Sequence, residues 1–233
     1  MSLLLKVSDI WKAYNGSPVL QGASFSFDET GIYVLMGDNG TGKSTLLRVC
    51  ALLEPHDRGE IAYLFHGKLL PHDIELRRKI TLVLPKIGVF NTTVFNNVAY
   101  GLKIRGLERE AIRERVNSTL DFVGLGHKKK QAALTLSSGE TQRLGIARAL
   151  VIKPEMLFLD EPAAFVDSKN REIIEGIIVS LKKEGGTTVI LTTHDMRQAK
   201  RLADRLLVLK QGLISSPWLQ TQHRLNLPIK DIP

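Results

Sequence analysis

The stretch Gly37-Asp38-Asn39-Gly40-Thr41-Gly42-Lys43-Ser44 decides the fold, because it fits the pattern G-x-x-x-x-G-K-[ST]. It follows the apolar run Ile32–Met36 and precedes a helical run through Leu46, Leu47 and Cys50. A strand, a glycine-rich turn and a helix in this order direct several backbone N–H groups and the positive end of the helix at one anion. The stretch therefore predicts a phosphate-binding loop rather than a structural turn.

Each part of this loop has an expected role at a nucleotide. Lys43 would reach the β and γ phosphates, and the Ser44 hydroxyl would be a ligand of Mg²⁺. The residues expected to contact the nucleotide are Gly37, Asp38, Asn39, Gly40, Thr41, Gly42, Lys43, Ser44 and Thr45.

Further short apolar runs alternate with helical patterns along the chain. Runs of this kind are typical of parallel strands that are buried on both faces. Residues 108–121 and 170–183 carry apolar side chains at helical spacing, with Ser168 expected as the N-cap of the second helix. The predicted strands are Ile32–Met36, Ile80–Leu84, Met156–Leu159, Val189–Leu191 and Leu206–Leu209. The alternation predicts an α/β fold with a mainly parallel sheet.

Two segments depart from this alternation. The β-rich runs Leu4–Ile10 and Val19–Phe27 flank a turn-like stretch, which predicts an N-terminal antiparallel β subdomain. Residues 85–135 look mostly helical and lie between strand-rich blocks, which predicts an inserted α-helical subdomain. The expected division is a nucleotide-binding core of residues 1–84 and 136–212, the helical subdomain 85–135 and a C-terminal tail 213–233.

Composition limits the class of protein. The chain has 233 residues, 43% of them hydrophobic, and a net charge of +8, which excludes disordered and collagenous chains. No apolar run reaches the roughly 18 residues that cross a bilayer. The one cysteine, Cys50, excludes an internal disulfide and is expected in the core. A soluble, cytoplasmic protein is expected, with its lysine and arginine clusters on solvated surfaces.

The run Met156–Leu159 ends in two carboxylates, Asp160 and Glu161. Parallel sheets bind ligands at the carboxyl ends of their strands, so both side chains should face the crevice that holds the phosphate loop. Asp160 would hold Mg²⁺, and Glu161 would polarise the attacking water. The alternative is a solvated acidic turn, which is less favoured because the same chain also contains the phosphate loop.

Between loop and carboxylates stands Leu136-Ser137-Ser138-Gly139-Glu140, followed by a helix rich in Ala and Leu. With the loop and Asp160-Glu161, this segment resembles the signature of the ATP-binding cassette (ABC) family, usually L-S-G-G-[QE]. The resemblance runs from about residue 3 to about residue 212 and implies a P-loop, RecA-like fold. It implies ATP and Mg²⁺ as cofactors and ATPase activity.

The resemblance also assigns single residues. His194 resembles the family's switch histidine, Asp167 lies in its D-loop, and Tyr14 sits where an aromatic ring stacks on adenine, with Trp11 as the alternative. Read alone, each would be a packed or capping side chain. The resemblance implies that two copies sandwich two ATP molecules, with Ser137 and Gly139 of one copy completing the site of the other.

The expected partners follow from the same resemblance. Such a chain drives a separate integral membrane permease from the cytoplasmic face of the membrane. An importer is expected, which adds a substrate-binding protein as an indirect partner. Residues 93–106 resemble oxyanion importers, especially those for tungstate. The alternatives are a non-transport cassette acting on nucleic acid, a partner we disfavour, and a cassette that uses ATP mainly as a dimerisation switch.

Three positions depart from the family pattern. Pro85 stands where the family has a glutamine that touches Mg²⁺ and water, and no glutamine occurs between Thr45 and Lys130. Proline has neither a side-chain oxygen nor an N–H. Ser138 replaces a glycine of the signature, and Ala163-Ala164 replaces the usual Thr-Ser. A slow ATPase is therefore expected.

Overall fold

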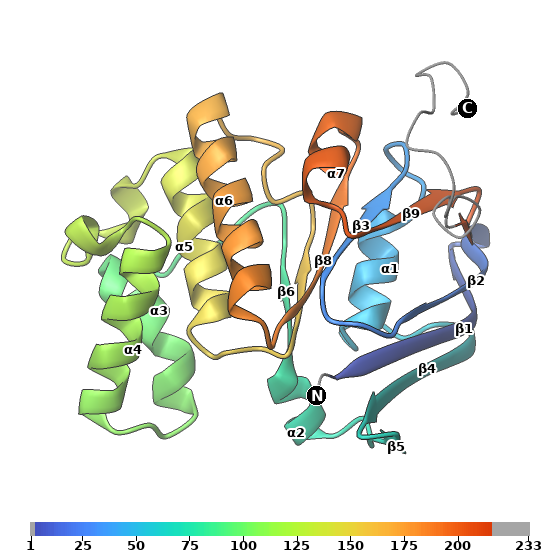
Figure 1. Ribbon diagram of the computed structural model, residues 1–233, viewed down its shortest axis with the longest axis horizontal. Coiled ribbons are helices and arrows are strands. Elements are labelled where there is room, and N and C mark those ends of the chain that lie inside the picture. The colour runs from blue at the N-terminus through green and yellow to red at the C-terminus, as the bar shows by residue number, and fades with distance from the viewer. Residues whose placement is uncertain (1–2, 216–233) are drawn as a thin grey trace.

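The computed structural model describes residues 3–215 and contains two sheets (Figure 1). The larger sheet has six strands in the order β10-β9-β3-β8-β7-β6. Its strands are β3 (Ile32–Met36), β6 (Ile80–Val83), β7 (Met156–Leu159), β8 (Thr188–Thr193), β9 (Arg205–Lys210) and β10 (Leu213–Ser215). All five predicted runs form strands of this sheet, which confirms the α/β fold.

Parallel pairing brings three strand ends to one edge of the large sheet. β8 lies between β3 and β7, with Met36 opposite Thr193 and Leu159 opposite Leu191. Since β7 and β8 are buried along their whole length, both faces of the sheet are covered. Segments that follow these strands therefore meet at one edge.

The smaller sheet is antiparallel, with the order β2-β1-β4-β5. Its strands are β1 (Leu4–Tyr14), β2 (Ser17–Phe27), β4 (Arg58–Phe65) and β5 (Lys68–Leu69). The predicted antiparallel β subdomain is present, and β1 continues four residues beyond the predicted Ile10. β4 was missed because its first residues, Arg58-Gly59-Glu60, carry no apolar pattern.

Seven α-helices connect the strands of the described residues. They are α1 (Lys43–Cys50), α2 (Ile74–Lys79), α3 (Val94–Ile104), α4 (Arg109–Phe122), α5 (Ser138–Leu150), α6 (Ser168–Glu184) and α7 (Met196–Leu202). α3 and α4 form the inserted helical segment and pack on α5.

Alternate residues of the large sheet face two separate hydrophobic cores. Val34, Leu157 and Leu191 pack with α3 to α7, whereas Tyr33 and Phe158 pack with α1 and the small sheet. Figure 1 shows α3 to α6 on one side of the strands and α1 with the small sheet on the other. Cys50 is buried in the second core, as expected.

Two local expectations need correction. The N-cap of α6 is Asp167 rather than Ser168, because the Asp167 carboxylate accepts the backbone N–H of Asn170 at 2.8 Å. The large sheet extends past residue 212, since β10 pairs with β9. The remainder of the predicted tail, residues 216–233, lies outside the described residues.

Arg143 of α5 ties the helical segment to the core. Its buried guanidinium donates from Nη1 to the carbonyls of Val123 and Gly124, at 2.9 and 3.1 Å, at the end of α4. Burial lowers the pKa of this guanidinium below its usual value.

Arg143→Met would leave both carbonyls without their donor and should lower the free energy of unfolding by about 1–3 kcal/mol. Urea unfolding measures this loss, and Arg113→Met, at an exposed arginine of α4, is the control. Equal stability of the two variants would contradict the anchoring role.

Candidate functional site

The phosphate loop joins β3 to α1 and needs glycine at both ends. At Gly37, φ is 158° and a Cβ would lie 2.5 Å from the Leu209 carbonyl oxygen of β9. At Gly42, φ is 100° and a Cβ would lie 2.7 Å from Val19 Cγ1 of β2. Side chains at these positions would push the loop away from both sheets.

The start of α1 has no side-chain cap. Its N-cap is Gly42, and no acidic residue lies in the first turn, which begins Lys43-Ser44-Thr45. The positive end of the helix is therefore uncompensated by carboxylates of its own first turn, as an anion site requires. Thr41 closes the loop by donating its hydroxyl to the Asp38 carbonyl at 2.9 Å, and Asn39 and Gly40 form its exposed tip.

Lys43 places a buried ammonium at the mouth of this loop. Its Nζ donates to the carbonyls of Gly37 at 2.7 Å and Asp38 at 2.9 Å. The same atom lies 3.8 Å from Oε1 of Glu161. A charge pair, which the sequence analysis did not predict, thus joins the loop to the residues that follow β7.

Glu161 lies between two nitrogen-bearing side chains. Its other carboxylate oxygen, Oε2, is 3.4 Å from Nδ1 of His194, which follows β8. Lys43, Glu161 and His194 lie on the segments that follow β3, β7 and β8, three strands whose carboxyl ends lie at the same edge of the sheet. A carboxylate next to a lysine and a histidine can orient a water beside a phosphate group that the loop holds.

Thr192 joins this group, and the sequence analysis did not single it out. Its hydroxyl donates to Oδ1 of Asp160 and accepts from the backbone N–H of Glu161, both at 2.8 Å. Asp160 is buried, and its own N–H donates to the Val83 carbonyl of β6 at 2.9 Å. The sequence offers one sign of this role, because Thr192 directly follows the predicted strand Val189–Leu191 and so lies at a strand end, as Asp160 and Glu161 do.

Tyr14 ends β1 beside the first turn of α1. Its hydroxyl hydrogen-bonds the Glu54 carboxylate and lies 3.5 Å from the Thr45 hydroxyl. Burial, followed by the bond to Glu54, raises the pKa of the phenol. The alternative ring, Trp11, has the Arg58 guanidinium 5.5 Å from its centroid and donates its indole N–H to a neighbouring aspartate. Tyr14 is thus the ring that contacts the helix following the loop.

The segment resembling the signature begins α5. Ser137 is the N-cap, and its hydroxyl accepts the N–H of Glu140 at 3.3 Å while the Glu140 carboxylate accepts the N–H of Ser137 at 3.0 Å. This capping box fixes the helix start. The hydrogen bond from Lys128 lowers the pKa of Glu140, so the carboxylate stays ionised. Ser138 is exposed at the first helical position.

Gly139 contacts α6 rather than open solvent. A Cβ at this position would lie 2.2 Å from Cγ of Asn170. The Asn170 side chain in turn donates to the Asp167 carboxylate at 2.8 Å. Gly139 and Asp167, which the sequence assigns to different motifs, therefore belong to one cluster that Asn170 joins.

The predicted site residues form two groups. Lys43, Asp160, Glu161 and His194 lie together at the phosphate loop, whereas Ser137, Gly139 and Asp167 lie at the starts of α5 and α6. Within residues 3–215, no hydrogen bond or ion pair joins the two groups. Of the first group, Lys43 begins α1, which Figure 1 shows across the large sheet from α5 and α6, whereas Asp160, Glu161 and His194 follow β7 and β8.

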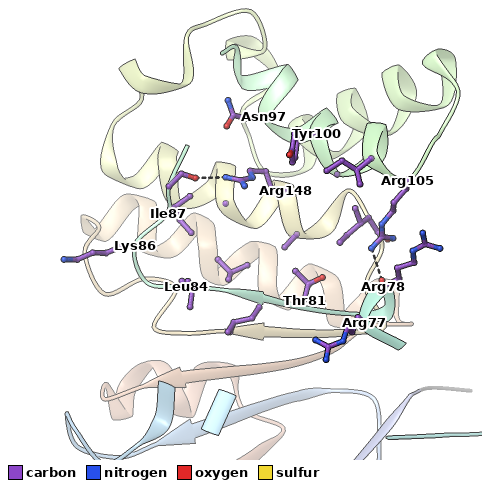
Figure 2. Close-up of a pocket in the computed structure, with 18 of the residues that line it drawn as sticks. Arg77, Arg78, Thr81, Leu84, Lys86, Ile87, Asn97, Tyr100, Arg105 and Arg148 are labelled. Carbon is purple, nitrogen blue, oxygen red and sulfur yellow. Dashed lines mark hydrogen bonds between the residues drawn. The ribbon is translucent and has the colours of Figure 1, made fainter. Parts of the chain in front are cut away.

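Pro85 follows β6 and stands in the chain between Leu84 and Lys86, which line a groove of about 570 Å³ (Figure 2). The groove lies between α2, β6, α3 and α5, and the chain after Pro85 forms part of its wall. Its lining contains four arginines and one lysine but no aspartate or glutamate: Arg77, Arg78, Lys86, Arg105 and Arg148.

Three of these arginines use backbone carbonyls as partners. Arg77 donates to the Leu52 carbonyl, Arg105 to the carbonyls of Arg78 and Ile152, and Arg148 to the Gly88 carbonyl. Figure 2 shows the Arg105 and Arg148 side chains bridging different walls in this way. Burial lowers the pKa of both these guanidinium groups. Because carbonyls are neutral, these bonds leave the charge of the three arginines uncompensated, whereas the fourth, Arg78, pairs with the Glu75 carboxylate at 2.8 Å.

No helix among residues 3–215 is both long and apolar enough to cross a membrane. In the same part of the chain, no three His, Cys, Asp or Glu side chains gather as a metal cluster.

Comparison with known proteins agrees with this geometry. The sequence profile described as ABC transporter matches residues 20–164. The tungstate uptake system ATP-binding protein TupC of Peptoclostridium acidaminophilum is 38% identical over 210 residues, which cover 90% of this chain and 96% of that protein. The phosphate import ATP-binding protein PstB 2 of Natronomonas pharaonis is 38% identical, over 90% and 78% of the two chains.

A solved structure shows the same fold. The structure of cbiO1 from Clostridium perfringens, part of the ABC transporter complex cbiONQ, superposes with a TM-score of 0.81 at 30% identity. The superposition covers 92% of this chain and 88% of that one. Together with the loop, the paired carboxylates and the signature segment, these likenesses establish that the chain belongs to the ABC transporter family and is an ATP-binding subunit with ATPase activity.

Proposed function

We propose that this chain hydrolyses ATP with Glu161 as the residue that polarises the attacking water. The observation that carries the proposal is the Glu161 carboxylate, 3.8 Å from the Lys43 ammonium and 3.4 Å from the His194 ring. Lys43 would neutralise the terminal phosphates, and His194 would contact the γ phosphate. Tyr14 would stack on adenine, next to Thr45.

We propose Mg²⁺ as the second cofactor, and the donor chemistry fits it. Mg²⁺ prefers oxygen ligands and uses few protein carboxylates, because substrate phosphates and waters complete its shell. The Ser44 hydroxyl in the first turn of α1 and the buried Asp160 carboxylate supply such oxygens. Mg²⁺ would neutralise charge that develops on the phosphates.

The separation of the two groups of site residues supports a head-to-tail homodimer. One copy carries the loop and Glu161, and Ser137 and Gly139 of a second copy would cover the γ phosphate at the start of α5. Within the single chain, the capping box and the contact of Gly139 with Asn170 already fix the position of that helix start. Asp167 lies in the same cluster and would face the partner.

Glu161→Gln tests both proposals together. An amide cannot act as a base, so phosphate release should fall at least about 100-fold while the loop still binds ATP. With Mg-ATP, light scattering after size exclusion should show that the variant accumulates as a dimer. Glu114→Gln, at an exposed position of α4, is the control and should behave as the wild type. Phosphate release at the wild-type rate from Glu161→Gln would contradict its role.

Pro85 supports a slow basal ATPase, because it offers no oxygen to Mg²⁺ or water. Pro85→Gln should raise phosphate release about 10-fold and lower the Mg²⁺ concentration needed for half-maximal rate. Titration of Mg²⁺ at saturating ATP measures both quantities, with Pro55→Gln at an exposed proline as the control. Unchanged rate and Mg²⁺ dependence would show that the proline is not the cause.

We propose that the complete transporter is an importer of an oxyanion such as tungstate. The support is the likeness, over 90% of this chain, to relatives named for tungstate uptake and phosphate import. A permease and a substrate-binding protein would select the ion. The chain itself would act at the cytoplasmic face of the membrane.

The groove beside Pro85 is the proposed contact for the permease. Exposed apolar residues border it, with Ile74 on α2, Leu84 after β6, and Tyr100 and Ile104 on α3. No aspartate or glutamate is among its lining residues; Arg78 pairs with Glu75 beside the groove, whereas Arg77, Arg105 and Arg148 donate to backbone carbonyls. An amphipathic helix whose polar side carries aspartate or glutamate fits both properties.

Ile104→Glu tests this contact, because the side chain is 67% exposed at the rim of the groove and belongs to neither hydrophobic core. A negative charge there should repel an acidic helix and reduce co-purification with the permease from detergent-solubilised membranes by about 10-fold or more. Leu69→Glu, 64% exposed on β5, is the matched control. Melting temperatures check that both variants fold, and equal recovery of the permease by the two would contradict this docking surface.

A further inference from the structure

Thr192 is the next-to-last residue of β8 and is completely buried. Its hydroxyl has one proton to donate and lone pairs to accept. The proton goes to Oδ1 of Asp160, and a lone pair accepts the N–H of Glu161, each at 2.8 Å. One side chain of the neighbouring strand therefore holds both residues that follow β7.

The bond to Asp160 fixes the rotation of a carboxylate that is expected to face Mg²⁺. Oδ1 is occupied by the threonine proton, which leaves Oδ2 free of that bond. A hydrogen bond to one oxygen of a ligating carboxylate orients the group and tunes its affinity for the metal. The backbone of Asp160 is held separately, through the Val83 carbonyl.

The bond to Glu161 holds an uncommon backbone conformation. Glu161 has φ of 45°, in the left-handed region that costs a residue with a side chain on the order of 1 kcal/mol. In this conformation its carboxylate reaches both Lys43 and His194. Because the N–H of Glu161 donates to Thr192, the hydroxyl stabilises the conformation that brings those groups together.

We propose that Thr192 is a positioning residue for ATP hydrolysis, acting on Asp160 through its proton and on Glu161 through its oxygen. The proposal rests on the roles assigned above to these two carboxylates. The Thr192 hydroxyl is then a third polar group of the site, beside the Asp160 and Glu161 carboxylates, whereas Pro85 supplies no side-chain oxygen. Removal of the hydroxyl should reduce the gain in ATP affinity that Mg²⁺ gives and should slow ATP hydrolysis, while the phosphate loop stays unchanged.

Thr188 supplies a matched control on the same strand. It is the first residue of β8 and is 1% exposed. Its hydroxyl has no hydrogen-bond partner among the described residues. Thr188→Val thus makes the same chemical change as Thr192→Val, in the same strand and at similar burial, at the opposite end of β8 from Asp160 and Glu161.

The experiment compares Thr192→Val, Thr188→Val and Thr192→Ser in the full chain. The first readout is the affinity for ATP with Mg²⁺ and with EDTA, which requires no hydrolysis. The second is phosphate release at saturating Mg-ATP. For Thr192→Val, the gain in affinity due to Mg²⁺ and the turnover rate should each fall about 10- to 100-fold, with the affinity in EDTA unchanged. Thr192→Ser should restore both, and Thr188→Val should match the wild type.

Several outcomes would overturn the proposal. It fails if Thr192→Val keeps the wild-type response to Mg²⁺ and turnover, or if Thr188→Val loses as much. It also fails if Thr192→Ser does not restore function at wild-type melting temperature. If Thr192→Val does not fold, Thr192→Ala, which leaves room for a water, takes its place. Wild-type turnover by Glu161→Gln would instead refute the proposed role of Glu161, and the response of ATP affinity to Mg²⁺ would still test Thr192.

Discussion

The site depends on the parallel register of three neighbouring strands. β8 lies between β3 and β7, so its last residues stand between the phosphate loop that follows β3 and the carboxylates that follow β7. This placement alone brings Thr192 to Asp160 and His194 to Glu161. A shift by one residue would exchange the side chains that pack in the two cores and would move Thr192 away from Asp160.

The sequence predicted the parts of the site whose chemistry is local. Glycine spacing identifies a phosphate loop, and an apolar run that ends in Asp160-Glu161 identifies a strand end, because each pattern lies within a few consecutive residues. The large sheet was predicted for the same reason. The prediction was poorer where local pattern is weak: β4 begins with polar residues, and the choice between Asp167 and Ser168 as N-cap depends on backbone geometry.

Contacts between distant segments could not be predicted in this way. Thr192 directly follows a predicted strand, but its place in the chain does not show that its partners are two residues more than thirty positions earlier. Gly139 shows the same limit. The family resemblance implies that it completes the ATP site of a second copy, whereas the structure shows that the missing side chain makes room for Asn170, which donates to Asp167. The contact with α6 therefore requires a glycine here, independently of any role at a nucleotide.

The groove and the hydrolytic site share one short segment of chain. Val83 accepts the N–H of Asp160 at 2.9 Å, and five residues later Gly88 accepts the Arg148 guanidinium in the groove. Pro85 lies between these two anchors. In this segment a proline fixes φ and supplies no hydrogen-bonding side chain, so the connection from groove to site runs through the backbone. A partner that displaced the wall at Gly88 would therefore act, through the backbone, on the strand end whose Val83 carbonyl accepts the N–H of Asp160.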